Sequence, residues 1–475
     1  MAYQHGVYTS EIETSVQSAQ PVDSALPFVV GTAPVVKGPV LVSTWSDFCA
    51  AFEVAASDYE AGDDGKIADS LVSFAYYWFV LAGRGDCFMQ SVASLGSSVV
   101  VPALQSINTI YERFGRAATI LCAPSASEDD TIAAAMASAV ANIGGRFKGV
   151  ALIDIPAGFA DSDDSIELAS VHENKPTTSP FACLCWPYVG VGDLRFAASV
   201  AMCAAMNATD GAYGGLPYVS PSNKALPVTG SYHVTDTALT ESFTDCGSAL
   251  IGSLHYVQDS EGHKITFGFD KEDATARIPG YPSVRVTLDS SGGTQYWRIN
   301  DADVSQLPSS FPFEVSYTGP AEAPLYLTRD EVNANLGAYG VCGFRNTASG
   351  WVLWGDNTAA FPGSTDVKDY MIPVRRMFNH VSNQFQIFAD GRVDMPLNNR
   401  QLEGVIKAFN QVLSGWVGFG ALNAASVKLD DDLNTAASLL SGVVYLRIMI
   451  APPPAMVVIQ GVLEYDVAGF ASSLA

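Results

Sequence analysis

The stretch that decides the fold class is residues 118–156, with the sequence ATILCAPSASEDDTIAAAMASAVANIGGRFKGVALIDIP. Apolar runs at 118–123 and 148–155 flank an alanine-rich segment of helical spacing, 129–143. Ser127-Glu-Asp-Asp130 has the S-x-x-D pattern that is typical of a helix N-terminus. A strand, a helix and a second strand in this order predict an α/β unit with a parallel sheet.

The same alternation of apolar runs continues on both sides of this stretch. Before it, the pattern predicts strands at 26–36, 40–45 and 87–93 and a helix at 66–82. After it, the pattern predicts a strand at 181–189 and a helix at 194–206.

A different pattern occupies residues 231–330. Short segments of alternating polarity, such as 264–269, 283–288 and 295–299, are separated by turn sequences such as Ser290-Ser-Gly-Gly293. Period-two alternation with frequent turns predicts a small all-β insertion.

Mixed structure returns after the insertion. The sequence predicts a strand at 351–354, a helical or mixed segment at 369–388 and a strand at 443–450 that ends at Pro452-Pro-Pro454. Residues 401–416 give the clearest helical pattern. Its apolar stripe consists of Leu402, Val405, Ile406, Phe409, Val412, Leu413 and Trp416.

Both ends of the chain have the composition of extended arms. The first 25 residues are mostly small and polar, so they contain too little apolar surface to fold alone. Residues 455–475 alternate in polarity, which predicts a strand with one buried face that pairs with something outside its own domain. The apolar face would carry Val457, Ile459, Leu463, Tyr465 and Val467.

Composition limits the classes of function. The net charge is −24, and we expect a chain this acidic not to coat nucleic acid, because phosphate binding needs clustered Lys and Arg. Only 16% of the residues are charged, against about 25% in typical domains, which indicates extensive subunit contacts or, alternatively, a large core. The eight cysteines form no CxxC pair and are expected to be buried free thiols of a reducing compartment. We expect no secretory signal in the first 25 residues and no membrane-spanning segment.

Motifs for catalysis or cofactor binding are missing. The sequence has no P-loop, HExxH, GxSxG or EF-hand pattern. Gly190-Val-Gly192 begins like a dinucleotide fingerprint, but Arg195 stands where its last glycine belongs. Asp161, Asp163 and Asp164 are more typical of a solvated loop than of a cation site. We therefore expect no cofactor, no metal and no enzymatic activity.

Several segments resemble, in order, the contractile-tail sheath proteins of bacteriophages and phage-like particles. One segment departs from the family pattern, because Ser222 stands where alanine is usual. The matching segments are His5-Gly-Val-Tyr8 with Leu26-Pro-Phe-Val-Val-Gly-Thr-Ala33, Asp154-Ile-Pro156 with Cys185-Trp-Pro-Tyr188, Gly211 to Asn223, Leu336 to Val341 with Gly350-Trp-Val-Leu-Trp-Gly355, and Tyr370-Met-Ile-Pro-Val-Arg-Arg376.

The resemblance implies a multidomain α+β and α/β protein with five parts. These are a linking arm (1–25), a sheath core in two parts (26–230 and 331–454), a β-rich outer insertion (231–330) and a linking strand (455–475).

The resemblance also implies the assembly and its action. The chain would form stacked rings of six copies around an inner tail tube, with baseplate and tail terminator proteins as further partners. Strand exchange between copies and a metastable lattice would drive the tube through the target cell envelope for genome ejection. No nucleic acid would be bound directly, no membrane entered, and the particle would be a virion tail assembled in the host cytoplasm.

The residues expected to act in assembly fall into two groups. The linking residues are Val7, Tyr8, Thr9, Ser10, Glu11, Ile12, Val457, Ile459, Leu463, Tyr465 and Val467. The candidates for charge pairs between copies are Arg375, Arg376, Arg392 and Arg400, since acids outnumber bases before residue 367 and nearly balance them after it. Two alternatives remain: another self-assembling virion protein, and an α/β enzyme with a polar pocket at the carboxyl ends of 118–123 and 148–155.

Overall fold

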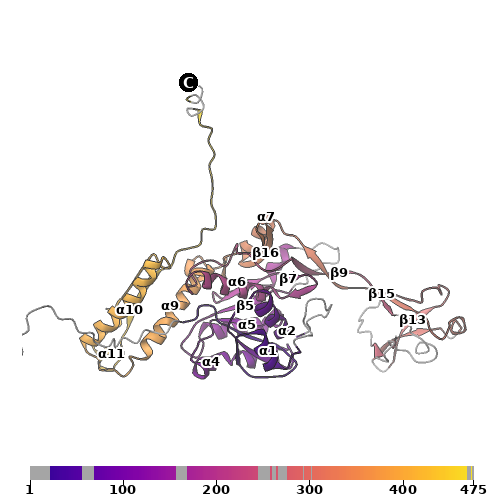
Figure 1. Cartoon of the computed structure of the whole chain (residues 1–475), viewed down its shortest axis with the longest axis horizontal. Helices are drawn as coiled ribbons and strands as arrows, with labels where there is room; N and C mark the ends of the chain where they lie inside the picture. Colours follow the sequence, from indigo (N-terminus) through magenta and orange to yellow (C-terminus); the bar gives the residue numbers. More distant parts are fainter. Residues whose placement is uncertain are drawn as a thin grey trace, which may run out of the picture. The chain divides into compact units, whose positions relative to one another are not determined.

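In the computed structural model of the chain (Figure 1), residues 118–156 form the strand–helix–strand unit that their sequence predicts. The elements are β4 (Ile120–Cys122), α5 (Asp130–Ala141) and β5 (Val150–Asp154), and the two strands pair in parallel. The helix cap is Asp129 rather than Ser127, because the Asp129 carboxylate accepts hydrogen bonds from the N–H groups of Thr131 (2.8 Å) and Ile132 (3.2 Å).

The structure describes residues 22–55, 69–156, 168–243, 257–258, 264–265, 275–291, 294–300, 302–467 and 472. The chain forms two compact units. Unit 1 contains Met1–Ile155, His172–Gly230 and Tyr326–Ala475, and unit 2 contains Pro156–Val171 and Ser231–Leu325. The expected linking residues Val7 to Ile12 and the aspartates at 161, 163 and 164 lie outside the described residues.

An eight-stranded sheet forms the centre of unit 1, in the order β17–β16–β6–β5–β4–β1–β3–β2. The inner strands are parallel, and the edge strands β2 and β17 are antiparallel to their neighbours. Alternate side chains of β4 and β5 are buried on both faces of the sheet, as expected where helices cover both faces. The strands not yet defined are β1 (Pro27–Thr32), β2 (Val40–Val42), β3 (Cys87–Val92), β6 (Ala182–Cys185), β16 (Val341–Thr347) and β17 (Gly350–Trp354).

Helices surround this sheet. Helix α6 (Ala198–Ala212) contacts β4, β5 and β6 and is buried along most of its length. The predicted helix at 194–206 is therefore shifted, because its first residues form β8 (Leu194–Phe196), which pairs with β7 (Tyr188–Val191). The other helices here are α1 (Trp45–Phe52), α2 (Ser70–Ala75) with a π-helical continuation (Tyr76–Leu81), α3 (Ser97–Leu104) and α4 (Ile107–Phe114).

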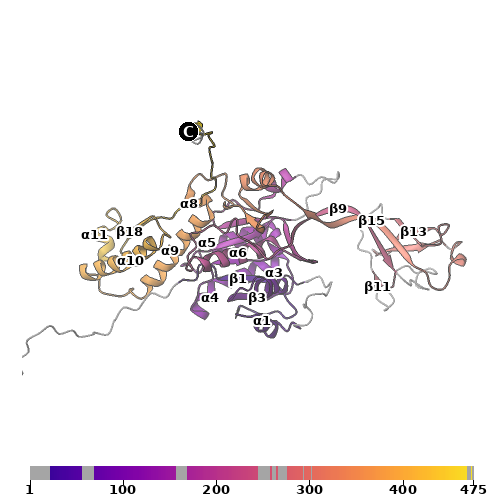
Figure 2. The ribbon, with the colours of Figure 1, turned by 45° about the horizontal axis from the view of Figure 1, so that its top comes forward.

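A second core in unit 1 lies between two long helices and a hairpin. Phe409 and Leu413 of α10 are fully buried here, and the rest of the predicted 401–416 stripe is partly buried. Figure 2 shows α9, α10 and β18 side by side. The elements of this core are α9 (Ile372–Asp390), α10 (Asn399–Phe419), β18 (Ala424–Leu429) and β19 (Leu446–Ala451). Three further helices of unit 1 are α7 (Arg329–Glu331), which lies near β16 in Figure 1, α8 (Val367–Tyr370) and α11 (Ala436–Leu440).

Unit 2 contains a long antiparallel ribbon of β9 (Gly230–Phe243) and β15 (Phe313–Leu325), with β12 (Thr275–Arg277) beside β15. Two further hairpins pair β10 (Val257–Gln258) with β11 (Lys264–Ile265) and β13 (Val286–Ser291) with β14 (Thr294–Ile299). Its small core is built from Ile278, Val284, Trp297, Ile299, Phe311, Phe313 and Val315.

The structure contains a single copy of the chain, so the predicted pairing of the C-terminal segment with a partner outside its own domain stays a prediction. Residues 452–466 form neither helix nor strand with the described residues. Both alternating sets of side chains are exposed, as Val457 (65%), Val458 (71%) and Ile459 (83%) illustrate. Within the part of the chain that the structure describes, the apolar side chains of Val457, Ile459, Leu463 and Val467 therefore stay exposed.

Two expectations concern side-chain chemistry and membranes. The cysteines at 49, 87, 122, 183, 185, 203 and 342 are free and buried, which confirms the prediction of buried thiols for these residues. Among the described residues, no helix is long and apolar enough to cross a bilayer. The same part of the chain contains no cluster of three or more His, Cys, Asp or Glu that could hold a metal ion.

Candidate assembly elements

Exposed apolar side chains concentrate in one part of the described chain. Most of the large hydrophobic residues that unit 1 leaves exposed lie after residue 390. Large exposed apolar surfaces usually mark sites of interaction with other proteins. Those before the C-terminal segment are Val393, Met395, Leu397, Phe419, Leu433, Leu440, Val443, Tyr445 and Met449.

The β18–β19 hairpin is an incomplete sheet. Its inward face, which includes Val427 opposite Ile448, packs on the core beneath α10. Its other face carries the exposed cations Lys428 and Arg447. Among the described residues each strand pairs only with the other. The outer edge of β18 is closed at Val427, whose N–H donates to Asn410 Oδ1 (2.8 Å) and whose carbonyl accepts from Asn410 Nδ2 (2.9 Å), so the open edge is that of β19. An open edge can accept an additional strand.

Arg376, one of the predicted charge-pair residues, is used inside its own chain. Its guanidinium donates to both carboxylate oxygens of Asp210, at 3.0 and 2.6 Å, and to the Ser24 carbonyl at 3.2 Å. Only 3% of each of the Arg376 and Asp210 side chains is exposed. Arg376 therefore offers no surface charge to a second copy, which corrects the expectation for this residue.

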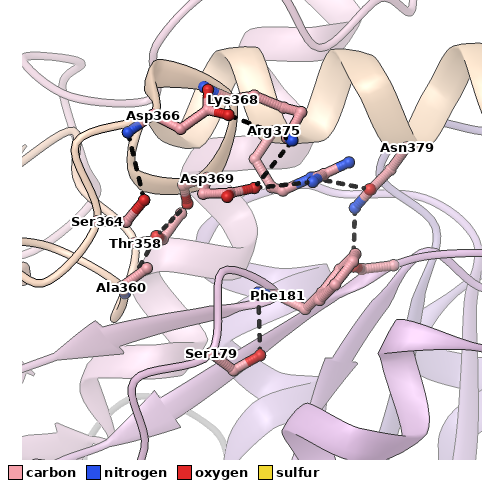
Figure 3. Close-up of polar contacts among 11 residues, drawn as sticks. Ser179, Phe181, Thr358, Ala360, Ser364, Asp366, Lys368, Asp369, Arg375 and Asn379 are labelled. Atoms are coloured by element: carbon pink, nitrogen blue, oxygen red, sulfur yellow. Dashed lines mark hydrogen bonds and ion pairs between the residues drawn. The ribbon is translucent and has the colours of Figure 1, made fainter.

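Arg375 is also buried, in the polar cluster at the start of α9 that Figure 3 shows. It donates to Asp369 (3.4 Å) and Asn379 (3.2 Å), and its guanidinium lies 4.9 Å from the Phe181 ring centroid. Burial lowers the pKa of Arg375, against the raising effect of nearby Asp369. The expectation of a contact with a neighbouring copy is corrected here too, because these partners are internal.

The other two arginines lie nearer the surface. Arg392 is half-buried, with its guanidinium 3.7 Å from the centroid of the Phe388 ring, and it lines a groove of about 1210 Å³. Arg400 is exposed in the first turn of α10. For Arg392 and Arg400 the predicted contact between copies stays a prediction.

Two of the sequence segments that resemble the sheath family come together. The stretch after α6 runs beside β17, with Asn223 N–H donating to the Leu353 carbonyl (2.7 Å) and Leu226 N–H to the Trp351 carbonyl (2.9 Å). Ser222, the departure from the family pattern, accepts a hydrogen bond from the Gly355 N–H at 3.1 Å. The segment after α6 therefore covers β17, which is an edge strand of the central sheet.

The crevice at the carboxyl ends of β4 and β5 tests the enzyme alternative. In open α/β sheets this is where ligands bind. Here Asp154 is buried and accepts hydrogen bonds from the hydroxyls of Ser127 (3.0 Å) and Ser199 (2.7 Å) and from the Ser199 N–H (2.7 Å). The Asp154 carboxylate therefore fixes the amino-terminal end of α6 through its bonds to Ser199. The adjacent cavity measures about 210 Å³.

Glu128, beside this crevice, makes stability depend on pH. Burial raises the pKa of Glu128 to about 7, although a hydrogen bond from the Tyr188 hydroxyl (2.7 Å) opposes the rise. Because an ordinary glutamate has a pKa of 4.5, the folded state binds the proton more tightly than the unfolded chain. Proton binding to Glu128 therefore stabilises the folded state. This stabilisation is complete below pH 4.5 and is lost as the pH rises through about 7.

We therefore expect Glu128→Gln to be more stable than the natural chain at pH 8, by up to about 3 kcal/mol. Below pH 4.5 the advantage should vanish, because the natural side chain is then neutral as well. Urea denaturation from pH 4 to 8 measures the difference, with Glu112→Gln on the surface as the control. Parallel pH profiles for Glu128→Gln and the natural chain would contradict the assignment.

Comparison with known proteins agrees with this architecture. No protein-family model matches the chain. A tail sheath protein of Burkholderia phage BcepMu is 26% identical over 144 residues, so the match spans 30% of this chain and 30% of that relative.

Two solved structures have the same fold over nearly the whole chain. The sheath complex of the PVC extracellular contractile injection system in its contracted state has a TM-score of 0.59 at 16% identity, covering 99% of both chains. A chain of the anti-feeding prophage baseplate has a TM-score of 0.58 at 16% identity, covering 98% of this chain and 100% of that one. The resemblance to contractile-sheath proteins is thereby confirmed, and the chain has the fold of this class.

Proposed function

We propose that this chain is the structural subunit of a contractile sheath and has no enzymatic role. The observation that carries the proposal is the apolar segment 455–467, exposed on both faces, in a chain whose hairpin strand β19 also has an open edge. A fold alone does not define a function, but these two features are the two halves of a strand-addition contact. Each copy can donate an extended segment, and each can accept one.

In this proposal the C-terminal segment, and also the N-terminal arm with Val7 to Ile12, add to the sheets of neighbouring copies. Val457, Ile459, Leu463 and Val467, whose side chains are exposed, would then be covered by the neighbouring copy. Backbone pairing fixes the register and tolerates rotation of the folded bodies that it joins. Flexible links of this kind suit a lattice that changes from one packing to another.

The assembly would consist of stacked rings of six copies around an inner tube, closed by baseplate and terminator proteins. Its metastable extended state would contract without nucleotide hydrolysis and drive the tube through the cell envelope. The β-rich segment 231–330 would lie on the outside. We place the assembled sheath in a virion tail that forms in the host cytoplasm, and we propose no cofactor and no direct nucleic-acid contact.

Negative-stain electron microscopy of the full chain, produced with the tube protein from the same particle, tests this proposal. Hollow rods with regular ring striations are the expected result. A chain that stays monomeric in the presence of both tube and baseplate would overturn the proposal and favour the enzyme alternative.

Charge reversal at Arg400 gives a more local test. We expect Arg400→Glu to reduce rod formation, because Arg400 is the most exposed of the candidate cations. The monomer should keep its stability or gain about 0.5 kcal/mol, since an acidic residue in the first turn of a helix is favourable. Rod yield by sedimentation and stability by urea denaturation measure the two effects. Arg329→Glu, on exposed helix α7, is the matched control, and equal rod yields for both variants would exclude Arg400 from the contact.

A further inference from the structure

The chain between the N-terminal arm and strand β1 is held by an unusual density of polar contacts. Each residue from 22 to 26 takes part in a hydrogen bond to a side chain of the body of unit 1. The five contacts are Val22 N–H to Gln384 (3.2 Å), Asp23 with Arg116 Nε (2.9 Å), Ser24 hydroxyl to Asp210 (2.5 Å), Ala25 carbonyl with Asn207 Nδ2 (3.0 Å) and Leu26 N–H to Thr119 (3.2 Å).

The centre of this set is the buried pair of Arg376 and Asp210. Asp210 accepts the Ser24 hydroxyl, and Arg376 donates to the Ser24 carbonyl. Both bonds involve charged groups that are screened from water, and such bonds are shorter and roughly twice as strong as neutral ones. Ser24 is therefore held on both sides by one ion pair.

The strand that follows adds a second restraint. β1 lies between β3 and β4 and is parallel to both, with Phe28 opposite Phe88 on one side and Leu121 on the other. A pull on residue 22 along the axis of β1 loads the hydrogen bonds of both ladders at the same time, because they lie across the direction of the force. Such a strand yields only when many bonds break together.

The C-terminal segment begins from a weaker attachment. It leaves β19, which among the described residues pairs only with β18, and it leaves at the open end of the hairpin, where Ala424 pairs with Ala451. Beyond the prolines, the Ala455 N–H lies 3.3 Å from the Met371 sulfur. A pull on this segment can open the hairpin one pair at a time from Ala451.

We propose that residues 22–26, with Arg376 and Asp210, form an anchor that carries tension, so that the N-terminal arm is mechanically the stronger of the two attachments. The anchor is a property of one chain. Its role in contraction rests on the proposed function, in which the arms carry tension between copies. Under that tension the β18–β19 hairpin would yield before β1.

Single-molecule force spectroscopy on the full chain tests the anchor without any assembly. One handle is a ligation tag inserted after Ser94, an exposed residue that follows the carboxyl end of β3, so that a pull from the N-terminus runs along β1. The second handle is placed at the N-terminus or at the C-terminus. We expect the first rupture from the N-terminal side to need about twofold more force. Asp210→Asn should lower that force and leave the C-terminal value unchanged.

Ser24→Ala provides a milder variant in case Asp210→Asn does not fold, and Asp330→Asn, in an exposed ion pair, is the control. Equal rupture forces in the two directions would overturn the anchor, as would a force from the N-terminal side that neither Asp210→Asn nor Ser24→Ala lowers. Failure of the full chain to form rods would instead contradict the proposed function and leave this measurement intact.

Discussion

A chain that ends at Ala455 is expected to fold as the full chain does and to form no rods. The side chains from Met456 to Val467 are exposed, with Leu463 at 100%, so their removal takes almost no buried apolar surface from the monomer. If they link neighbouring copies, their removal deletes that link from every subunit of the lattice. Urea denaturation should therefore give the same free energy of unfolding for both chains, while electron microscopy shows rods only for the longer one.

A proline scan of the same segment separates strand addition from general apolar contact. An added strand at an edge donates only every second N–H to its partner, and proline removes an N–H. Substitutions at consecutive positions such as Val458, Ile459 and Gln460 should therefore alternate between strong and weak loss of rods. Uniform loss would indicate that side chains rather than backbone bonds form the contact. Rods of normal yield from the truncated chain would contradict the linking role altogether.

The sequence predicts local elements well where the apolar residues repeat with the period of one element type, a helix or a strand. The strand–helix–strand unit at 118–156 and helix α10 both form as their apolar patterns indicate. The pattern at 181–189 predicts one strand, but the structure has β6 and β7 on either side of Pro187, which has no N–H to donate to a ladder. The helix cap at Asp129 was missed because Ser127 turns inward to Asp154.

Long-range partners could not be predicted in the same way. Strand β16 joins the central sheet beside β6, with Val341 opposite Leu184, after a large intervening part of the chain. A periodic pattern describes one face of one element and does not identify what covers it. For the same reason, the alternation at 455–467 predicts a strand but not whether its partner lies in the same chain.

The paired arginines at 375 and 376 show how this limit affects an assembly prediction. Their charge and their position in a family-like segment led to the expectation of contacts between copies. In the structure, Arg376 meets Asp210, a residue that the sequence gives no reason to pair with it, and the pair is closed off from water. A basic residue in a motif can thus hold the fold rather than the interface, and stability measurements distinguish the two.

Asp210→Ala is accordingly expected to destabilise the monomer by about 3–5 kcal/mol, because it leaves the Arg376 charge buried without its counter-ion. The same substitution removes the acceptor of the Ser24 hydroxyl, so the start of β1 should lose protection from hydrogen exchange. Urea denaturation and exchange of the amides from 22 to 32 measure the two effects.

The double variant Asp210→Ala with Arg376→Met should recover much of the loss, since replacing a buried ion pair by apolar groups is often nearly neutral. Asp330→Ala, which breaks the exposed pair with Arg329, should cost less than about 1 kcal/mol. If Asp210→Ala lowers the free energy of unfolding as little as Asp330→Ala does, water must reach Arg376. The pair of Arg376 and Asp210 then cannot be the anchor that holds Ser24. If instead the double variant is as unstable as Asp210→Ala, the loss comes from the contact with Ser24 rather than from an isolated charge.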